Sequence, residues 1–238
     1  QGVKCDHSEH LYGEFWHRAF IVAADTPNCN YLISCGSNIE ASGGVVGVWR
    51  HSQARVRGMK RVQVEPHLSV TGACSAQWVP IKPKTDAAFL YALIHVLLHE
   101  VPRERLDLPF LARRTASAYL VGPNGYYLRD RATRKPLVFD ATAGRARVHD
   151  SEGLDEALHA QVEVDAIEIG PDDEVLADGV LAGRTAFDAL VAHMQPYSPE
   201  WAAGICDVPA DTMRGIAREY VEQACVGQTI EIEGQRLP

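Results

Sequence analysis

The sequence lacks an excess of positive charge: 23 lysine and arginine residues stand against 31 aspartate and glutamate residues, a net charge of −8. A chain of this charge has no general attraction for nucleic acid or anionic lipid, so no nucleic-acid partner is predicted. A long hydrophobic run is also missing. The longest, 87–98, has about half of the roughly 20 residues that a membrane span needs. The sequence therefore predicts no membrane-spanning helix.

Cysteine motifs are missing as well, because the six cysteines are dispersed without a CxxC pair or a short disulfide framework. A chain of 238 residues can bury a core without disulfides. Hydrophobic residues make up 46% and charged residues 23%, which excludes a disordered or fibrous protein. The chain starts at Gln1 without a methionine, and residues 234–238 resemble the start of a further element. We therefore expect an internal segment of a larger polypeptide.

The region between residues 30 and 100 has the most readable pattern. Short apolar runs at 31–35, 61–66 and 78–81 predict three strands, and the apolar residues of 45–56 predict a helix between the first two. A strongly apolar helix is expected at 86–100, surrounded by the rest of the domain. Strands that alternate with helices favour βαβ units. We expect an α/β fold with a Rossmann-like parallel sheet flanked by helices.

The remaining chain predicts a small irregular or β insertion and then a helical C-terminal part. A turn at Pro123–Gly125 indicates a hairpin, and apolar residues between 162 and 169 indicate one or two short strands. Three helices follow, and we expect Asp207 to cap the last of them. The predicted organisation is a dinucleotide-binding core at 25–120, an insertion at 121–182 and a helical return at 183–228.

Three loops that follow the predicted strands carry candidate binding residues. The loop 35–40 places a glycine directly after a buried strand, where backbone N–H groups can face a phosphate. Glu65 closes the second strand 29 residues after Gly36, where dinucleotide sites place a ribose-binding carboxylate. In the third loop, 82–86, Asp86 can accept two hydrogen bonds from a guanine. Each candidate has an alternative without a ligand: the loop 35–40 is an ordinary turn, Glu65 is a solvated glutamate at a strand end, and Asp86 is a partner of the helix dipole.

A fourth candidate lies at the start of the chain. Cys5, His7, His10 and His17 are the types of residue that bind zinc, but their spacing matches no familiar finger or ribbon. Cys5 as the thiolate ligand of another soft metal is a sharper hypothesis. A buried, inert cysteine is the third interpretation.

Several motifs together resemble the molybdopterin oxidoreductases of the dimethyl sulfoxide reductase family. The resemblance covers nearly the whole chain and is most specific at 78–88; within the family it is closest to the respiratory branch with polysulfide, thiosulfate and arsenate reductases and phenylacetyl-CoA oxidoreductase. The motifs are YLISCGSN at 31–38, VEP at 64–66, WVPIKPKTDAA at 78–88, YSPEWAA at 197–203 and a Pro-Ala-x-Thr helix start at 209–212.

The resemblance implies a bis-molybdopterin guanine dinucleotide cofactor with molybdenum or tungsten. Gly36, Ser37 and Asn38 are implied to hold its pyrophosphate, and Asp86 to bind a guanine. Glu65 and His67 stand where the family usually has Asp and Arg, and Lys84 stands where Gly is usual. The implied cofactor-binding residues are Cys35, Gly36, Ser37, Asn38, Glu40, Glu65, His67, Lys82, Lys84, Thr85 and Asp86.

The same resemblance gives the start of the chain a role. Cys5 lies 30 residues before Cys35, a distance similar to that between the metal-ligating cysteine and the dinucleotide loop in this branch. Cys5 is thereby implied to ligate the metal, and His7 and His10 to be catalytic proton donors on the substrate side. A 4Fe-4S cluster is expected on a preceding part of the polypeptide. The implied partners are a small-molecule substrate, a membrane anchor, an iron–sulfur electron-transfer subunit, and the rest of the catalytic subunit.

Three functions remain open from the sequence. The first is the cofactor-binding part of a molybdenum-dependent oxidoreductase of anaerobic respiration, inactive as an isolated segment, which transfers an oxygen atom, a hydride or electrons to or from a small substrate. The second is a Rossmann-like nucleotide-binding module without a redox metal. The third is a purely structural α/β domain. The sequence does not identify the substrate. It also leaves two compartments open for a bacterial or archaeal protein: the periplasm, reached by twin-arginine export, and the cytoplasm.

Overall fold

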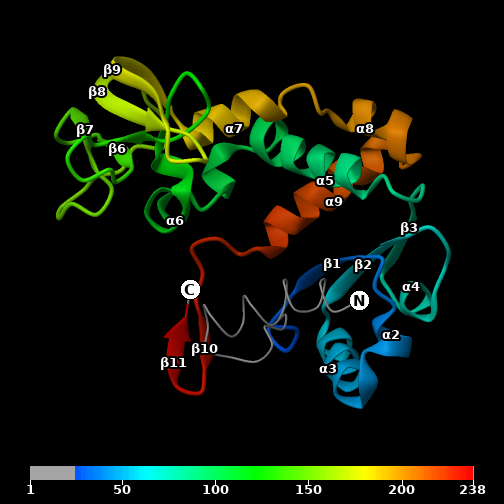
Figure 1. Ribbon diagram of the computed structural model, residues 1–238. Coiled ribbons are helices and arrows are strands. Elements are labelled where there is room, and N and C mark those ends of the chain that lie inside the picture. Colours follow the sequence, from blue (N-terminus) through cyan, green and yellow to red (C-terminus); the bar gives the residue numbers. More distant parts are fainter. Residues whose placement is uncertain (1–24, 238) are drawn as a thin grey trace. The chain divides into compact units, whose positions relative to one another are not determined.

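The computed structural model describes residues 25–237 (Figure 1). These residues divide into two compact units, of which the first ends at Pro80 and the second begins at Ile81. None of the helices in the described part is both long and apolar enough to span a lipid bilayer.

The first unit is built on a parallel sheet of three strands in the order β1-β2-β3. Cys35 pairs with Val64, and Glu65 with Pro80, so the carboxyl ends of the strands meet at one edge. The elements are β1 (Tyr31–Cys35), α2 (Ile39–Ser42), α3 (Gly44–Arg57), β2 (Lys60–Glu65), α4 (Val70–Ala73) and β3 (Gln77–Pro80).

The central strand β2 is buried on both faces. Val62 and Val64 lie on one face, and alternation along the strand places Arg61, Gln63 and Glu65 on the other. Arg61 contacts residues of α2, α3 and α4, so all three helices cover this polar face. A strand with polar residues at every second position is therefore part of the core, because the helices and loops above it supply hydrogen-bond partners.

The helices of the second unit pack around α5, whose buried residues include Phe89 and Ala92. We expected one helix surrounded on all sides at 86–100. Instead, the α-helix ends at His95 and continues as a π-helical turn, and Leu90 and Tyr91 stay exposed. The helical elements are α5 (Asp86–His95), η3 (Val96–Glu100), η4 (Arg103–Arg105), α6 (Leu108–Arg114), η5 (Ala116–Ala118), α7 (Ala186–Met194), α8 (Pro199–Cys206) and α9 (Ala210–Gln223).

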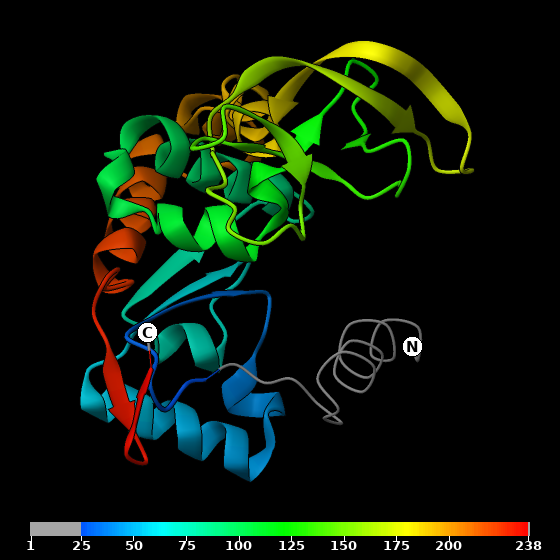
Figure 2. The same cartoon turned by 90° about the vertical axis from the view of Figure 1, so that its left-hand side faces the viewer.

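The strands of the second unit are antiparallel. A long hairpin of β8 and β9 forms the middle of a sheet in the order β4-β9-β8-β5, and Figure 2 shows it as a curved ribbon. Buried leucines at 120, 128 and 137 form its core. The strands are β4 (Leu120–Val121), β5 (Leu128–Arg129), β6 (Leu137–Asp140), β7 (Arg145–Val148), β8 (Gln161–Ile169), β9 (Val175–Thr185), β10 (Ile230–Ile232) and β11 (Gln235–Leu237).

The mixed α/β class is confirmed, but the parallel arrangement holds for three strands, and the sheets of the second unit are antiparallel. The expected hairpin around Pro123–Gly125 is reduced to a bridge between Val121 and Tyr127, because β4 and β5 pair with β9 and β8 instead. The prediction that Asp207 caps the last helix is wrong. Asp207 ends α8 with a left-handed backbone at φ 59°, and Pro209 precedes α9.

Candidate functional site

The candidate site of the first unit lies at the carboxyl edge of its parallel sheet. Gly36 follows β1 with φ +68°, a conformation that favours glycine, and its N–H donates to the Val64 carbonyl at 2.9 Å. A Cβ atom at Gly36 would meet no atom within 4 Å, so this backbone is open to a ligand. Cys35 and Ser37, on either side, are exposed.

Asn38 is held by a residue that sequence reasoning missed. The buried Thr71 hydroxyl donates to Asn38 Oδ1 at 2.9 Å and accepts the Glu40 N–H at 2.9 Å. Thr71 thus fastens the loop after β1 to the short helix α4. Because Oδ1 serves as the acceptor here, Nδ2 is the donor that Asn38 can offer to a ligand.

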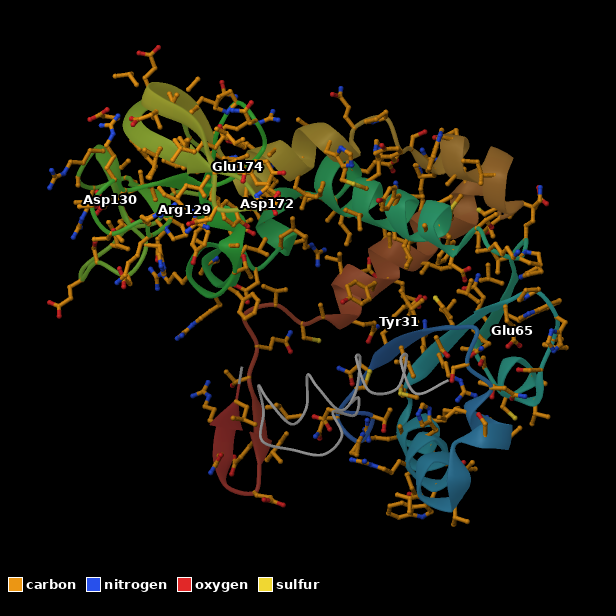
Figure 3. The ribbon with its side chains drawn as sticks, in the orientation of Figure 1. Tyr31, Glu65, Arg129, Asp130, Asp172 and Glu174 are labelled. Carbon is orange, nitrogen blue, oxygen red and sulfur yellow. The ribbon has the colours of Figure 1, made fainter. Side chains whose placement is uncertain are left out.

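Glu65 ends β2 beside α4, as Figure 3 shows. Its side chain is buried, with Oε1 accepting the Ser69 N–H at 2.8 Å and Oε2 accepting Gln63 Nε2 at 3.0 Å. A Cβ on Gly72 would lie 2.5 Å from Oε1, so glycine is needed there for the carboxylate to lie against α4. The Ser69 hydroxyl bonds to the same carboxylate. An ionised carboxylate has about four acceptor positions, so three of them are used.

The pKa of Glu65 is lowered overall. Burial raises the pKa by disfavouring the charged form, but hydrogen bonds from Ser69 and Gln63 and the charge of His67 outweigh it. Glu65 is therefore an ionised acceptor at neutral pH. His67 itself is exposed. Chemically, this edge offers backbone N–H groups to an anion and a fixed carboxylate to sugar hydroxyls.

Glu40 has a different role from the other loop residues. Its carboxylate pairs with Arg61 at 2.9 Å, and the two side chains are 7% and 0% exposed. The same guanidinium donates to the Thr71 carbonyl at 3.0 Å and to Ser75 Oγ at 2.9 Å. Glu40 is thus the anionic partner of a buried cation, and it fixes α2 to β2.

The candidate residues of the second unit lie at the start of α5. Lys82, Lys84 and Asp86 are exposed, and Asp86 occupies the first turn of the helix. Thr85 stands at the N-cap position of α5, but its hydroxyl donates to the Lys82 carbonyl at 2.6 Å and makes no cap bond. Lys84 has φ 68°, the left-handed conformation that glycine adopts at low cost.

The remaining predicted site residues, Cys5, His7 and His10, lie outside the described residues, as does His17. Within residues 25–237, no group of three or more His, Cys, Asp or Glu residues is arranged to hold a metal ion. The hypotheses about a metal ligand and proton donors therefore stay predictions.

Comparisons with known proteins identify related chains. No family model matches the sequence. A sulfite dehydrogenase subunit of Allochromatium vinosum is 30% identical over 178 residues, which cover 71% of this chain and 17% of the relative. The thiosulfate reductase molybdopterin-containing subunit PhsA of Salmonella typhimurium is 32% identical over 215 residues, which cover 90% of this chain and 19% of the relative. The alpha subunit of the perchlorate reductase of Dechloromonas aromatica is 26% identical over 236 residues, which cover 83% of this chain and 24% of the relative.

The chain therefore spans less than a quarter of the length of these relatives. Among solved structures, acetylene hydratase from Pelobacter acetylenicus aligns with a TM-score of 0.48 and 16% sequence identity. The alignment covers 82% of this chain and 17% of the acetylene hydratase chain.

Proposed function

Since this chain belongs to the molybdopterin oxidoreductases of the dimethyl sulfoxide reductase family, we propose that it binds a guanine dinucleotide form of molybdopterin within the catalytic subunit of an oxidoreductase. The observation that carries this proposal is the meeting of an open Gly36 loop and an ionised, buried Glu65 at the carboxyl ends of parallel strands. Open α/β sheets bind their ligands at this edge, so the Rossmann-like description is part of the proposal.

The residues present fit such a group. A dinucleotide brings anionic phosphates and ribose hydroxyls, which need donors and acceptors respectively. Gln63 Oε1 is a buried acceptor without a hydrogen-bond partner among the described residues. Glu65 holds one further acceptor position beside it. These atoms match the donors that a ribose supplies.

Each residue of the first unit has a defined task in the proposal. Gly36 shapes the turn, its own N–H being bonded to the Val64 carbonyl, so that the backbone N–H of Ser37 and the amide of Asn38 donate to the pyrophosphate. Glu65 accepts from ribose hydroxyls. His67 adds a donor at the exposed rim. Cys35 lines the loop, and Glu40 acts through Arg61 to keep the loop in place.

The remaining tasks rest on the family resemblance. We assign Lys82, Lys84, Thr85 and Asp86 to a guanine, Cys5 to the metal, and His7 and His10 to proton transfer. When bound, the molybdenum supplies two-electron redox chemistry on a small substrate. An iron–sulfur cluster, partner subunits and the organisation into core 25–120, insertion 121–182 and helical return 183–228 belong to the same proposal.

The test measures metal and nucleotide in the purified protein. Molybdenum by mass spectrometry and guanine nucleotide released by acid are expected to copurify in constant proportion. Asp86→Ala is expected to abolish their retention, because the guanine loses its bidentate acceptor. The matched control is Asp211→Ala, which removes another exposed first-turn aspartate, that of α9. Retention of both components by Asp86→Ala contradicts the guanine assignment.

A second candidate is a Rossmann-like nucleotide-binding module without a redox metal. The open Gly36 loop and the fixed Glu65 carboxylate suit the phosphates and ribose of any nucleotide, which is the observation that favours this candidate. Nucleotide that copurifies without molybdenum or tungsten from cells supplied with both metals supports this candidate over the first.

A further inference from the structure

Gln63 is a buried residue at the candidate site that neither the sequence motifs nor the family resemblance singled out. It lies in the middle of β2, opposite Ser34 of β1 and Trp78 of β3, and it is fully buried. Neighbouring positions on the opposite face of the strand are valines, Val62 and Val64. An amide at the centre of a buried sheet costs free energy unless its polar atoms are bonded.

The amide nitrogen of Gln63 joins two parts of the site. Nε2 carries two protons, and it donates one hydrogen bond to the Ser37 carbonyl and one to Glu65 Oε2, both at 3.0 Å. One side chain therefore links the loop after β1 to the carboxylate that ends β2.

The bond to Ser37 also sets the direction of the next peptide N–H. The described chain has no cis peptide bond, and in a trans peptide the C=O and the following N–H point in opposite directions. With the Ser37 carbonyl turned toward Gln63, the Asn38 N–H is turned away from it. Gln63 thereby presents a backbone donor on the outer side of the loop, where a phosphate can accept it.

The amide oxygen of Gln63 is bonded differently. Oε1 is buried and has no hydrogen-bond partner among residues 25–237. Arg61, two residues earlier on the same face, has acceptors for its guanidinium from three helices. A buried acceptor without a hydrogen bond calls for an explanation, because methionine or leucine would fill the same space without the free-energy cost of burying an unbonded polar atom.

We propose that Gln63 is a positioning residue of the nucleotide site, which holds the Gly36–Asn38 loop and the Glu65 carboxylate in their binding geometry and offers Oε1 to a donor that the ligand brings. This inference rests on the proposed function. It adds a specificity element, since a ligand with ribose hydroxyls supplies the missing donor.

The test uses the whole protein, expressed in cells that cannot make the pterin, with guanosine diphosphate as the probe in calorimetry. Gln63→Met removes both hydrogen bonds at similar volume. Because two bonds are lost, the dissociation constant is expected to rise about tenfold or more. Two controls separate positioning from stability: Val62→Ala opens a cavity on the opposite face of β2, and Gln53→Leu changes an exposed glutamine of α3. Both controls are expected to bind within about twofold of the natural protein.

A further variant gives a signature that mere destabilisation lacks. Gln63→Glu places a second carboxyl group beside Glu65, and the two share one proton because like charges at this distance cannot both ionise readily. Binding of guanosine diphosphate by Gln63→Glu is expected to strengthen as the pH falls, since a protonated carboxyl again donates. The natural protein has no such pair at this position.

The outcomes separate this inference from the proposed function. Unchanged affinity in Gln63→Met, or an equal loss in Val62→Ala, overturns the positioning role while the proposed function stands. A pH-independent affinity in Gln63→Glu overturns it as well. If the natural protein itself does not bind guanosine diphosphate, the proposed function fails first, and the positioning role fails with it.

Discussion

Removing Arg61 is expected to destabilise the first unit strongly, because its guanidinium is the buried cation on which α2, α3 and α4 converge. The Arg61 and Glu40 side chains are 0% and 7% exposed, with 2.9 Å between Nη2 and Oε1. At an effective dielectric constant of about 20, this attraction is about 6 kcal/mol. Desolvation of the two ions costs several kcal/mol each, so the intact pair adds little net stability.

The expected effect of a single substitution is larger than the net value of the pair. Arg61→Met leaves the buried Glu40 carboxylate with Arg55, 3.6 Å away and 35% exposed, as its remaining cation. The expected loss is therefore about 3 kcal/mol of unfolding free energy, the low end of the range for a broken buried pair. It also leaves Ser75 Oγ and the Thr71 carbonyl without their donor. His51 loses a cationic neighbour: burial and Arg61 lower its pKa, while Glu40 raises it, so its pKa is expected to rise in the variant.

A double-mutant cycle measures the coupling. Arg61→Met, Glu40→Gln and the double variant are unfolded in urea and followed by tryptophan fluorescence. Because the double variant has no uncompensated charge, its loss is expected to fall short of the sum of the single losses by about 2 kcal/mol or more. The internal control is the exposed pair of Arg131 and Asp165, 2.6 Å apart with 40% and 66% exposure, whose coupling is expected below about 1 kcal/mol.

Two results would refute this reasoning. One is a loss below about 1 kcal/mol for Arg61→Met, which is the range of a solvated pair. The other is additivity of the two substitutions within about 0.5 kcal/mol, which is typical of residues that do not interact.

Two further predictions concern the candidate binding residues. Lys84→Gly is expected to raise the unfolding free energy by about 0.5–1 kcal/mol, since relief of the left-handed backbone at φ 68° outweighs the entropy of glycine; a lower melting temperature contradicts this. Because the folded pKa of Glu65 lies below its ordinary value of 4.5, the stability that its ionised form adds is present above that value and lost as the pH falls through the folded pKa. Glu65→Gln is therefore expected to be less stable than the natural protein at pH 7 and to approach it on acidification, in urea titrations across this range. A stability difference that does not change with pH contradicts the lowered pKa.

Local patterns predicted much of the first unit. The apolar run before Gly36, the strand that ends at Glu65 and the short strand before the lysine-rich loop are found within one or two residues of their predicted bounds. These signals are readable because strand ends, glycine turns and helix starts depend on neighbouring residues. Ser198 and Pro199 likewise begin α8 with a cap and a first residue that are typical of helix starts.

Other elements were not readable from local patterns. The strand β9 contains Asp178 and Gly179, which interrupt its apolar pattern, and it forms because β8 pairs along its length. Asp207 lies two residues before Pro209, close to a helix start, where aspartate is a common N-cap. It instead ends α8, because a helix end needs a left-handed residue and aspartate tolerates that conformation.

The positions of the three parallel strands and the chemical types at their carboxyl ends were readable from the sequence alone, since both follow from short-range patterns. Which of those polar side chains are already bonded within the protein was decided by the tertiary structure. Glu40 pairs with Arg61, Asn38 with Thr71, and Gln63 joins Ser37 to Glu65. Each partner lies on a different segment of the chain, and burial makes each bond obligatory, so only the folded arrangement selects which atoms remain for a ligand.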